Sequence, residues 1–286
     1  MNKSRTLRPL LVLVCSGLLL LPVHAVADTS LEDARERGSL RASFVNEVPF
    51  GYIGRDGQAT GEAPEIARVI LERIGIDRLE GRLTEWPSLI PGLDAGRWDV
   101  IAAGMYITPE RCEQVLFTEP TYRIGQAFLV DAGNPHDLHS YDDVRANSGI
   151  TLGIMEGAVE RDYAERAGVS DRQIETIPTQ QEMLAALKAG RVDAVALSEL
   201  SIAEMAEQGG GRVEMFEDFA TPDYAMGYGA FAFRKDDRAL RDAFNEELTA
   251  FIGSDEHLEL VEPFGFGEDN LPDIDREQLC AGAIHD

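Results

Sequence analysis

The chain has 286 residues, of which 51 are acidic and 26 are basic, giving a formal net charge of −25 at pH 7. A surface this acidic repels a phosphate backbone, which argues against nucleic acid as a partner. The length suits two domains of ordinary size. Beyond one N-terminal apolar run, no segment of the sequence has the length and apolar character of a membrane-spanning helix.

Residues 1–27 have the pattern of a secretory signal peptide. Basic side chains precede an apolar stretch at 10–21, and a small-residue cleavage motif ends at Ala27. Cys15 lies too deep in the apolar stretch, and follows too large a residue, to mark a lipoprotein. We therefore expect cleavage near Ala27 and an exported protein whose mature chain begins at about Asp28.

The mature chain keeps two cysteines, Cys112 and Cys280. An exported compartment permits a disulfide between them. We expect this bond to form and to tie the C-terminal segment to the short helix that Cys112 shares with Arg111. Two buried free thiols are the alternative.

Apolar periodicity predicts alternating strands and helices in the first half of the mature chain. We expect helices at 31–37, 63–74 and 88–95 and strands at 40–44, 82–86 and 98–102. This order is typical of a parallel sheet covered by helices, on which ligands bind beyond the carboxyl ends of the strands. The loops at those ends hold five candidate ligand contacts, namely Glu47, Phe50, Trp86, Tyr106 and Arg111.

A second run of the same kind follows. It has predicted strands at 150–154 and 192–196 and predicted helices at 159–167 and 181–189. Segments 93–102 and 187–196 each contain a helix end, a glycine, a basic residue, an aspartate and a buried strand. We infer that the chain repeats one α/β unit in two lobes.

Two apolar extended runs, 126–130 and 230–233, are predicted to join the lobes, one going out and one coming back. Two crossing strands make a hinge, and a hinge between two lobes makes a cleft. A helix predicted at 236–252 then returns to the first lobe. The predicted domains after the signal peptide are lobe 1 at 28–130 and 231–286 and lobe 2 at 131–230.

The stretch 105–112 ends an apolar run, turns and opens a helix. Gly104, which we include among the ligand-facing residues, gives the backbone the freedom to turn after the strand. Thr108 suits an N-cap, and Pro109 suits the first helical position. Arg111 then lies in the first turn, beside free N–H groups that favour an anion. Its guanidinium could hold a carboxylate by two parallel hydrogen bonds. The alternative is a surface arginine paired with a neighbouring acid.

With these features, the mature chain resembles the periplasmic solute-binding proteins of ABC importers that take polar amino acids and related zwitterions. Segments 46–52, 88–93, 108–112 and 262–266 are similar to those of ectoine and hydroxyectoine binders. The resemblance implies a type II periplasmic binding protein fold, with two parallel-type sheets flanked by helices. It also implies a monomer in the periplasm that needs no cofactor and delivers a small zwitterionic solute to the membrane permease of an importer.

The resemblance also assigns roles to individual side chains. In that family an arginine matching Arg111 grips the ligand carboxylate, and a glutamate matching Glu47 bonds the ring nitrogens. Aromatic residues matching Phe50, Trp86 and Tyr106 surround the cationic ring. The family usually has tyrosine and phenylalanine at the last two positions, so Trp86 and Tyr106 are departures that keep an aromatic face. Each such face attracts a delocalised cation by about 0.5 to 2 kcal/mol when desolvated. Plain core packing is the alternative for these three aromatics.

The second lobe is expected to supply the closing contacts, from the turn at Glu156, Gly157 and Ala158 and from Ser198 at a strand end. Many amino-acid binders have a hydroxyl residue where Ala158 stands and an aspartate where Ser198 stands. The missing aspartate argues against an ordinary α-amino acid, whose localised ammonium group needs a partner. A delocalised cation remains compatible with the site.

Three other functions stay open. The cargo could be a polar or basic amino acid or a betaine. The chain could be a dehydratase-like enzyme on the same fold, with Glu47 or Glu156 as acid or base. It could also be a sensor whose closed form docks on a receptor. The five histidines are scattered outside the expected cleft, and no nucleophile or metal motif is present. We therefore expect neither catalysis nor a metal.

Overall fold

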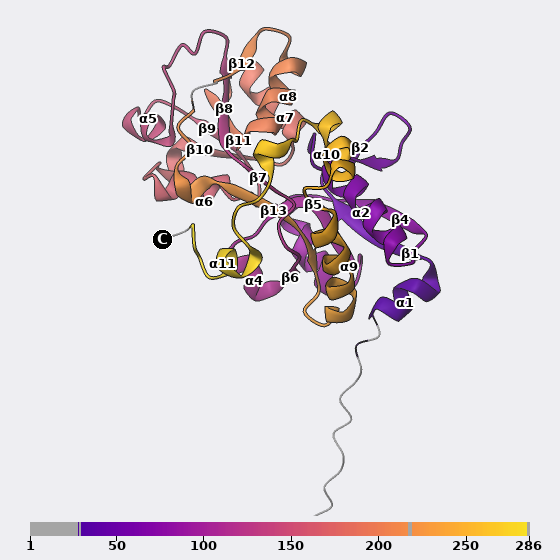
Figure 1. Ribbon diagram of the computed structural model, residues 1–286. Coiled ribbons are helices and arrows are strands. Elements are labelled where there is room, and N and C mark those ends of the chain that lie inside the picture. Colours follow the sequence, from indigo (N-terminus) through magenta and orange to yellow (C-terminus); the bar gives the residue numbers. More distant parts are fainter. Residues whose placement is uncertain (1–27, 29, 217–218, 285–286) are drawn as a thin grey trace, which may run out of the picture.

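The computed structural model describes residues 28, 30–216 and 219–284. The chain forms two α/β lobes, each built on its own sheet (Figure 1). The predicted signal peptide, residues 1–27, lies outside the described residues. Within the described part, no helix combines the length and apolar character needed to cross a membrane.

The first lobe is built on a sheet with the strand order β4-β1-β5-β13-β6, in which β7 also pairs with β13. Strand β1 runs parallel to β4 and β5, whereas β13 runs antiparallel to its neighbours. The strands are β1 (Ser39–Phe44), β4 (Arg78–Leu83), β5 (Val100–Tyr106), β6 (Leu116–Phe117), β7 (Tyr122–Ile124) and β13 (Gly227–Phe233). A small hairpin, β2 (Tyr52–Ile53) and β3 (Ala59–Thr60), precedes the first long helix.

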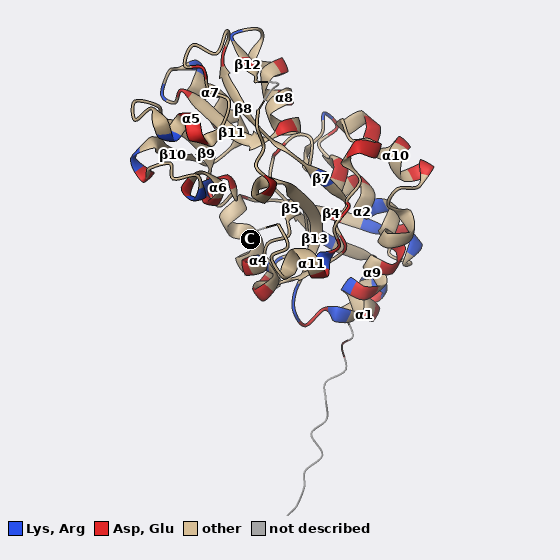
Figure 2. Cartoon of the chain, turned by 60° about the vertical axis from the view of Figure 1, so that its left-hand side comes forward, with Lys and Arg blue, Asp and Glu red and all other residues tan. Residues whose placement is uncertain are grey.

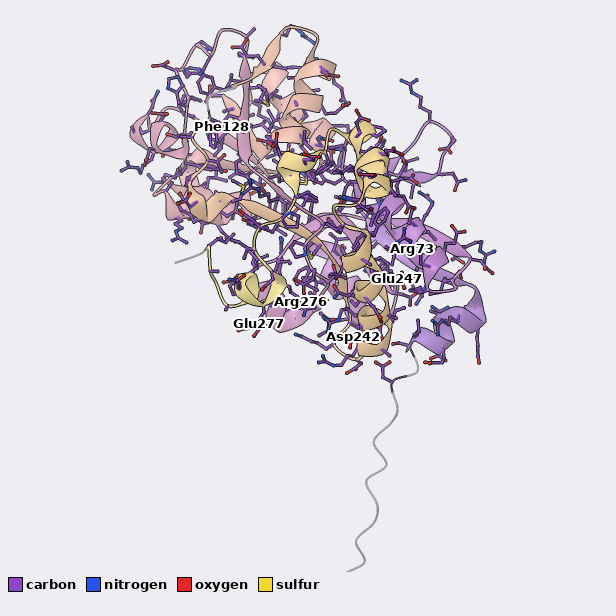
Figure 3. All side chains as sticks on the ribbon, viewed as in Figure 1. Arg73, Phe128, Asp242, Glu247, Arg276 and Glu277 are labelled. Atoms are coloured by element: carbon purple, nitrogen blue, oxygen red, sulfur yellow. A yellow bond between two sulfur atoms is a disulfide. The ribbon has the colours of Figure 1, made fainter. Side chains whose placement is uncertain are left out.

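Both faces of this sheet are buried. Successive residues of β5 point to opposite sides of the sheet, so this one strand contributes to the core on each side. Val100 and Ala102 belong to one core cluster, and Ile101 and Ala103 to another. The helices of the first lobe are α1 (Ser30–Arg37), α2 (Glu62–Arg73), α3 (Leu89–Asp94), α4 (Pro109–Gln114), α9 (Arg238–Phe251), α10 (Asp255–Val261) and α11 (Arg276–Cys280). The labelled side chains of Arg73 and Asp242 lie on this lobe, and Phe128 lies in the other (Figure 3).

The second lobe has a five-stranded sheet in the order β10-β9-β11-β8-β12. Its strands are β8 (Gln126–Asp131), β9 (Leu152–Met155), β10 (Ile174–Ile177), β11 (Ala194–Ser198) and β12 (Val213–Met215), and its helices are α5 (Tyr141–Ala146), α6 (Glu160–Arg166), α7 (Gln180–Lys188) and α8 (Glu199–Gly209). Acidic residues lie on helices of both lobes (Figure 2). The predicted two-lobed fold is confirmed, but both sheets are mixed rather than parallel.

The internal repeat is visible in matching hydrogen bonds of two aspartates. The Asp99 amide donates to the Arg41 carbonyl (2.8 Å), and the Arg41 amide donates back to the Asp99 carboxylate (3.0 Å). Asp193 and Thr151 make the same two bonds in the second lobe, at 2.8 and 2.7 Å. In each lobe the repeated aspartate therefore ties the start of a central strand to its parallel neighbour.

The predicted hinge strands each belong wholly to one sheet. Strand β8 pairs with β11 and β12 in the second lobe, and β13 pairs with β5 in the first. The sheets therefore divide the chain near residues 125 and 226, about five residues before the predicted boundaries at 130 and 231. An apolar run fits either sheet equally well when both sheets are covered on both faces, so the sequence pattern could not assign these strands.

The predicted strand at 82–86 is wrong. Strand β4 spans Arg78–Leu83, and Trp86 instead opens a short 3₁₀ helix, Trp86–Ser88. Because β4 is an edge strand with a largely exposed surface, it lacks the apolar alternation that identifies a half-buried strand. The expected end of β5 is also wrong, because the strand continues through Gly104 to Tyr106. Gly104 has a φ of +64°, and the β5–β13 register is irregular there, as in a β-bulge.

A disulfide joins Cys112 of α4 to Cys280 of α11, as the sequence predicted. The two cysteines are 168 positions apart in sequence. Figure 1 shows α11 beside α4, and the labelled Arg276 and Glu277 in Figure 3 mark the position of α11. The bond therefore fixes the C-terminal segment to the helix that carries Arg111.

Candidate functional site

A cavity with about 340 Å³ of empty space lies between the lobes, beyond the carboxyl ends of β1, β5 and β9. Its lining contains seven of the ten predicted ligand contacts, which are Glu47, Phe50, Trp86, Gly104, Tyr106, Arg111 and Ala158. The other lining residues are Ala103, Tyr122, Val159, Glu160 and Leu197. Both lobes therefore contribute to one site.

Arg111 is held in place by its own helix start and by backbone carbonyls of both lobes. The Thr108 hydroxyl caps α4 by accepting from the Arg111 amide (3.3 Å). The guanidinium donates to the Tyr106 carbonyl (3.0 Å) and, across the cleft, to the Gly157 carbonyl (3.5 Å). It also lies 5.6 Å from the centre of the Trp86 ring. Arg111 thus faces the cavity, and its remaining N–H donors suit a ligand carboxylate.

Glu47 presents a buried carboxylate to the cavity from the loop after β1. It is 6% exposed, and it accepts hydrogen bonds from the Ser201 hydroxyl (2.7 Å) and the Trp86 indole (3.2 Å). Burial raises the pKa of Glu47, while these two hydrogen bonds lower it. Each carboxylate oxygen has a second lone pair, so Glu47 can still accept a hydrogen bond from a ligand N–H group.

Close-packed aromatic rings form one wall of the cavity. The Phe50 ring lies 5.3 Å from that of Tyr122, and the Tyr106 ring lies 6.4 Å from Tyr122. The Tyr122 hydroxyl donates to the Gly104 carbonyl (2.9 Å). A Cβ on Gly104 would lie within 2.8 Å of atoms of Phe50 and Tyr122, so only glycine fits there. The aromatic wall therefore depends on the bulge in β5.

Tyr122 was missed at the sequence level, although β13 carries a signal for it. A Cβ on Gly227 would fall 2.3 Å from the Tyr106 ring, and one on Gly229 would fall 2.2 Å from the Tyr122 ring. Alternate glycines within a strand often mark the close approach of another group. Here they make room for two of the rings in the cavity wall.

The four second-lobe candidates differ in where the structure places them. Glu156 is exposed and does not line the cavity. Ser198 is buried, but its hydroxyl caps α8 by accepting from the Ser201 amide (3.4 Å), which turns it away from the ligand site. Gly157 contributes its backbone carbonyl, and Ala158 lines the cavity as expected. The strand-end rule indicates which loops border the cavity but not which of their side chains point into it.

Two second-lobe side chains, Gln180 and Ser201, form hydrogen bonds with the backbone of Val48 in the first lobe. The Gln180 side chain accepts from the Val48 amide (3.0 Å) and donates to the Val48 carbonyl (3.0 Å). The Ser201 hydroxyl lies 3.2 Å from the same carbonyl. These contacts link the two lobes directly, so we treat Gln180 and Ser201 as a latch of the closed cleft.

The fold and this cavity define the class of the protein. Two α/β lobes with two crossovers enclose a site in which an arginine, a carboxylate and an aromatic wall face one another. This is the type II, cleft-closing class of ligand-binding proteins. A model of the bacterial extracellular solute-binding proteins, family 3, matches residues 41–268. The chain belongs to this family.

Individual relatives agree with this assignment. The chain is 35% identical over 272 residues to a probable amino-acid ABC transporter periplasmic-binding protein, y4tE, of Sinorhizobium fredii, covering 92% of this chain and 90% of that one. It is similar to the crystal structure of EhuB in complex with hydroxyectoine, with a TM-score of 0.83 and 36% identity over 88% of this chain and 98% of that one. An ancestral arginine-binding protein bound to glutamine follows at a TM-score of 0.72 and 27% identity, covering 81% and 99%.

The coarse function follows from the family. The protein is an extracytoplasmic solute-binding protein that delivers amino acids or other polar solutes to an ABC importer, as the sequence resemblance implied. The family as a whole consists of binding proteins rather than enzymes.

Proposed function

We propose that the solute is ectoine or hydroxyectoine. The observation that carries this proposal is the arrangement of Arg111 and Glu47 around one cavity, beside the aromatic wall of Phe50, Tyr106 and Tyr122. Ectoine is a cyclic zwitterion whose positive charge is spread over an amidinium. Its carboxylate suits the guanidinium, its ring suits the aromatic faces, and its N–H groups suit the Glu47 carboxylate.

The similarity to EhuB, solved with hydroxyectoine, supports the same ligand class. Trp86 combines two roles in this arrangement, because it contacts the Arg111 guanidinium and also donates a hydrogen bond to Glu47. We propose that the ring of the solute binds against Phe50 and Tyr106, with Trp86 holding the two charged side chains in position.

A polar or basic amino acid is the second candidate. The observation that favours it is Glu160, which places a second carboxyl group in the cavity from the second lobe. An ionised Glu160 would suit the localised ammonium group of an α-amino acid. The similarity to an arginine-binding protein bound to glutamine points in the same direction.

Titration calorimetry of the mature protein separates the two candidates. The ligands are ectoine, hydroxyectoine, glycine betaine, glutamine and arginine, each at low and high salt. We expect tight binding of the two ectoines only. Betaine has no N–H group for Glu47, so it is expected to bind weakly. Tight binding of glutamine or arginine, with no heat from the ectoines, would replace the proposed cargo while leaving the transport role unchanged.

The latch predicts how the closed state is held. In Gln180→Ala, the closed cleft loses the two hydrogen bonds between Gln180 and Val48. We expect binding to weaken by about 1 kcal/mol, mainly through faster release of the solute. Stopped-flow dissociation measures the release rate, and small-angle scattering measures the fraction of closed protein.

Gln208→Ala is the matched control for this variant. Gln208 is exposed, and its side chain donates to Glu204 within the same helix, α8. The control is expected to release the solute at the wild-type rate. Equal rates in Gln180→Ala and the wild type would show that the latch does not contribute to closure.

A further inference from the structure

Glu160 is a buried carboxyl group in the ligand cavity whose hydrogen bond comes from its own backbone amide. It is the first residue of α6, it lines the ligand cavity, and it is 4% exposed. Among the described residues, no other side chain donates a hydrogen bond to its carboxyl group. A buried polar group in this position is costly unless something in the cavity pairs with it.

The charges around the cavity do not balance with Glu160 ionised. Arg111 supplies one positive charge, while Glu47 and Glu160 would supply two negative charges. A zwitterionic solute adds no net charge, and its carboxylate occupies the guanidinium that would otherwise compensate Glu160. Its cationic part is placed against Glu47 and the aromatic wall. An ionised Glu160 would then be left as an unpaired charge in a closed cavity, which is strongly unfavourable.

The groups that face Glu160 from the neighbouring elements reinforce this imbalance. The charged ones are Glu47 of the first lobe, Asp162 of α6 and Arg111 of α4. The titratable hydroxyls that interact with it are those of Tyr106, Tyr122, Tyr141 and Tyr163. Arg111 is thus opposed by two acids, and the tyrosines contribute no positive charge.

We propose that Glu160 is a specificity-determining ligand contact that binds the solute in its neutral, protonated form, so that closure on a zwitterion takes up one proton. This inference rests on the proposed function of the cavity as a solute site. A neutral carboxyl group both donates and accepts a hydrogen bond. It therefore favours zwitterions that carry a hydroxyl or another uncharged polar group, and it disfavours solutes with a second cationic centre.

The expected pH dependence follows from the two states of the cleft. In the closed form, burial raises the pKa of Glu160 to about 8. In an open cleft, water reaches the group and its pKa returns toward the ordinary value. Between the two values the bound form carries the proton and the free form does not. The affinity is therefore expected to fall about tenfold for each unit that the pH rises in this interval.

Calorimetry in two buffers with different ionisation heats, at a pH of about 6.5, counts the protons directly. Wild-type protein is expected to take up about one proton per bound solute. Glu160→Gln keeps a neutral hydrogen-bonding group, so it is expected to bind without this uptake and with an affinity that no longer falls with pH. Glu165→Gln, which changes an exposed acid on the same helix, is the matched control and is expected to retain the uptake.

Two results would overturn the proposal: no proton uptake by the wild type, or the same uptake in Glu160→Gln. The proton count can be made with whichever solute of the calorimetric series binds. If arginine binds instead of the ectoines, the proposed cargo fails while Glu160 is still tested. Arginine bound without proton uptake would show that Glu160 acts as an ionised counter-ion.

Discussion

Replacing Arg111 by alanine is expected to abolish solute binding while leaving the protein folded. The buried carboxylate of the solute would lose its guanidinium partner, and breaking a buried ion pair from one side costs about 3–5 kcal/mol. The affinity would then fall by more than about a hundredfold. Calorimetry measures the loss of binding, and circular dichroism together with the thermal midpoint tests the fold.

Arg111→Lys is the control for charge alone. Lysine keeps the positive charge but cannot form two parallel hydrogen bonds to a carboxylate. In the wild type, the Arg111 guanidinium also donates to the Tyr106 and Gly157 carbonyls, which fix its direction. We therefore expect Arg111→Lys to bind only weakly. Near-normal affinity in Arg111→Ala would mean that the solute carboxylate is held elsewhere.

Trp86→Ala is expected to weaken binding by about 1–3 kcal/mol, through lost ring contact and lost attraction between the ring and a cation. The ring contacts Arg111, and its indole N–H donates to Glu47. Trp86 also separates the ligand cavity from a neighbouring groove with about 710 Å³ of empty space, because both cavities share Glu47 and Trp86 in their lining. The variant is therefore expected to accept larger solutes as well.

Trp86→Phe distinguishes the two roles of this side chain. Phenylalanine keeps an aromatic face toward Arg111 but removes the hydrogen bond to Glu47. We expect an affinity between those of the wild type and Trp86→Ala, measured by the same calorimetry. If Trp86→Ala bound ectoine as tightly as the wild type, Trp86 would have no part in the site.

The parts of the candidate site that the sequence could predict are those determined by local sequence. Thr108 and Pro109 define the start of α4, and this local signal fixes Arg111 in the first turn of that helix independently of distant segments. The repeated glycine and aspartate of the two lobes likewise identified equivalent strands, because those residues cap a helix and bond the next strand locally. The resemblance to a known family supplied the roles of Glu47 and the aromatic residues.

The errors concern properties that only tertiary structure determines. An apolar run does not reveal which sheet it joins, so the predicted lobe boundaries lie about five residues after the points where the two sheets divide the chain. The edge strand β4 has no buried face, so its position was predicted too late in the sequence. Ser198 and Ser201 are three residues apart, yet Ser198 caps α8 while Ser201 bonds Glu47 across the cleft. Periodicity does not distinguish these two directions.

Glu160 was overlooked because a glutamate in the first turn of a helix is ordinarily an exposed residue that interacts with the helix dipole. In the structure this residue is instead buried and lines the cavity between the two lobes. Tyr122 of β7 lies beside Tyr106 of β5 within the first-lobe sheet, because both strands pair with β13. Contacts that second-lobe residues make across the cleft exist only where the two lobes meet, so the local sequence pattern does not reveal them.

A crystal structure of the mature protein with ectoine tests the central claim most directly. We expect the solute carboxylate within hydrogen-bond distance of the Arg111 guanidinium, its ring against Phe50 and Tyr106, and a ring N–H directed at Glu47. A solute bound with its carboxylate away from Arg111, or outside the cavity between the lobes, would contradict the account.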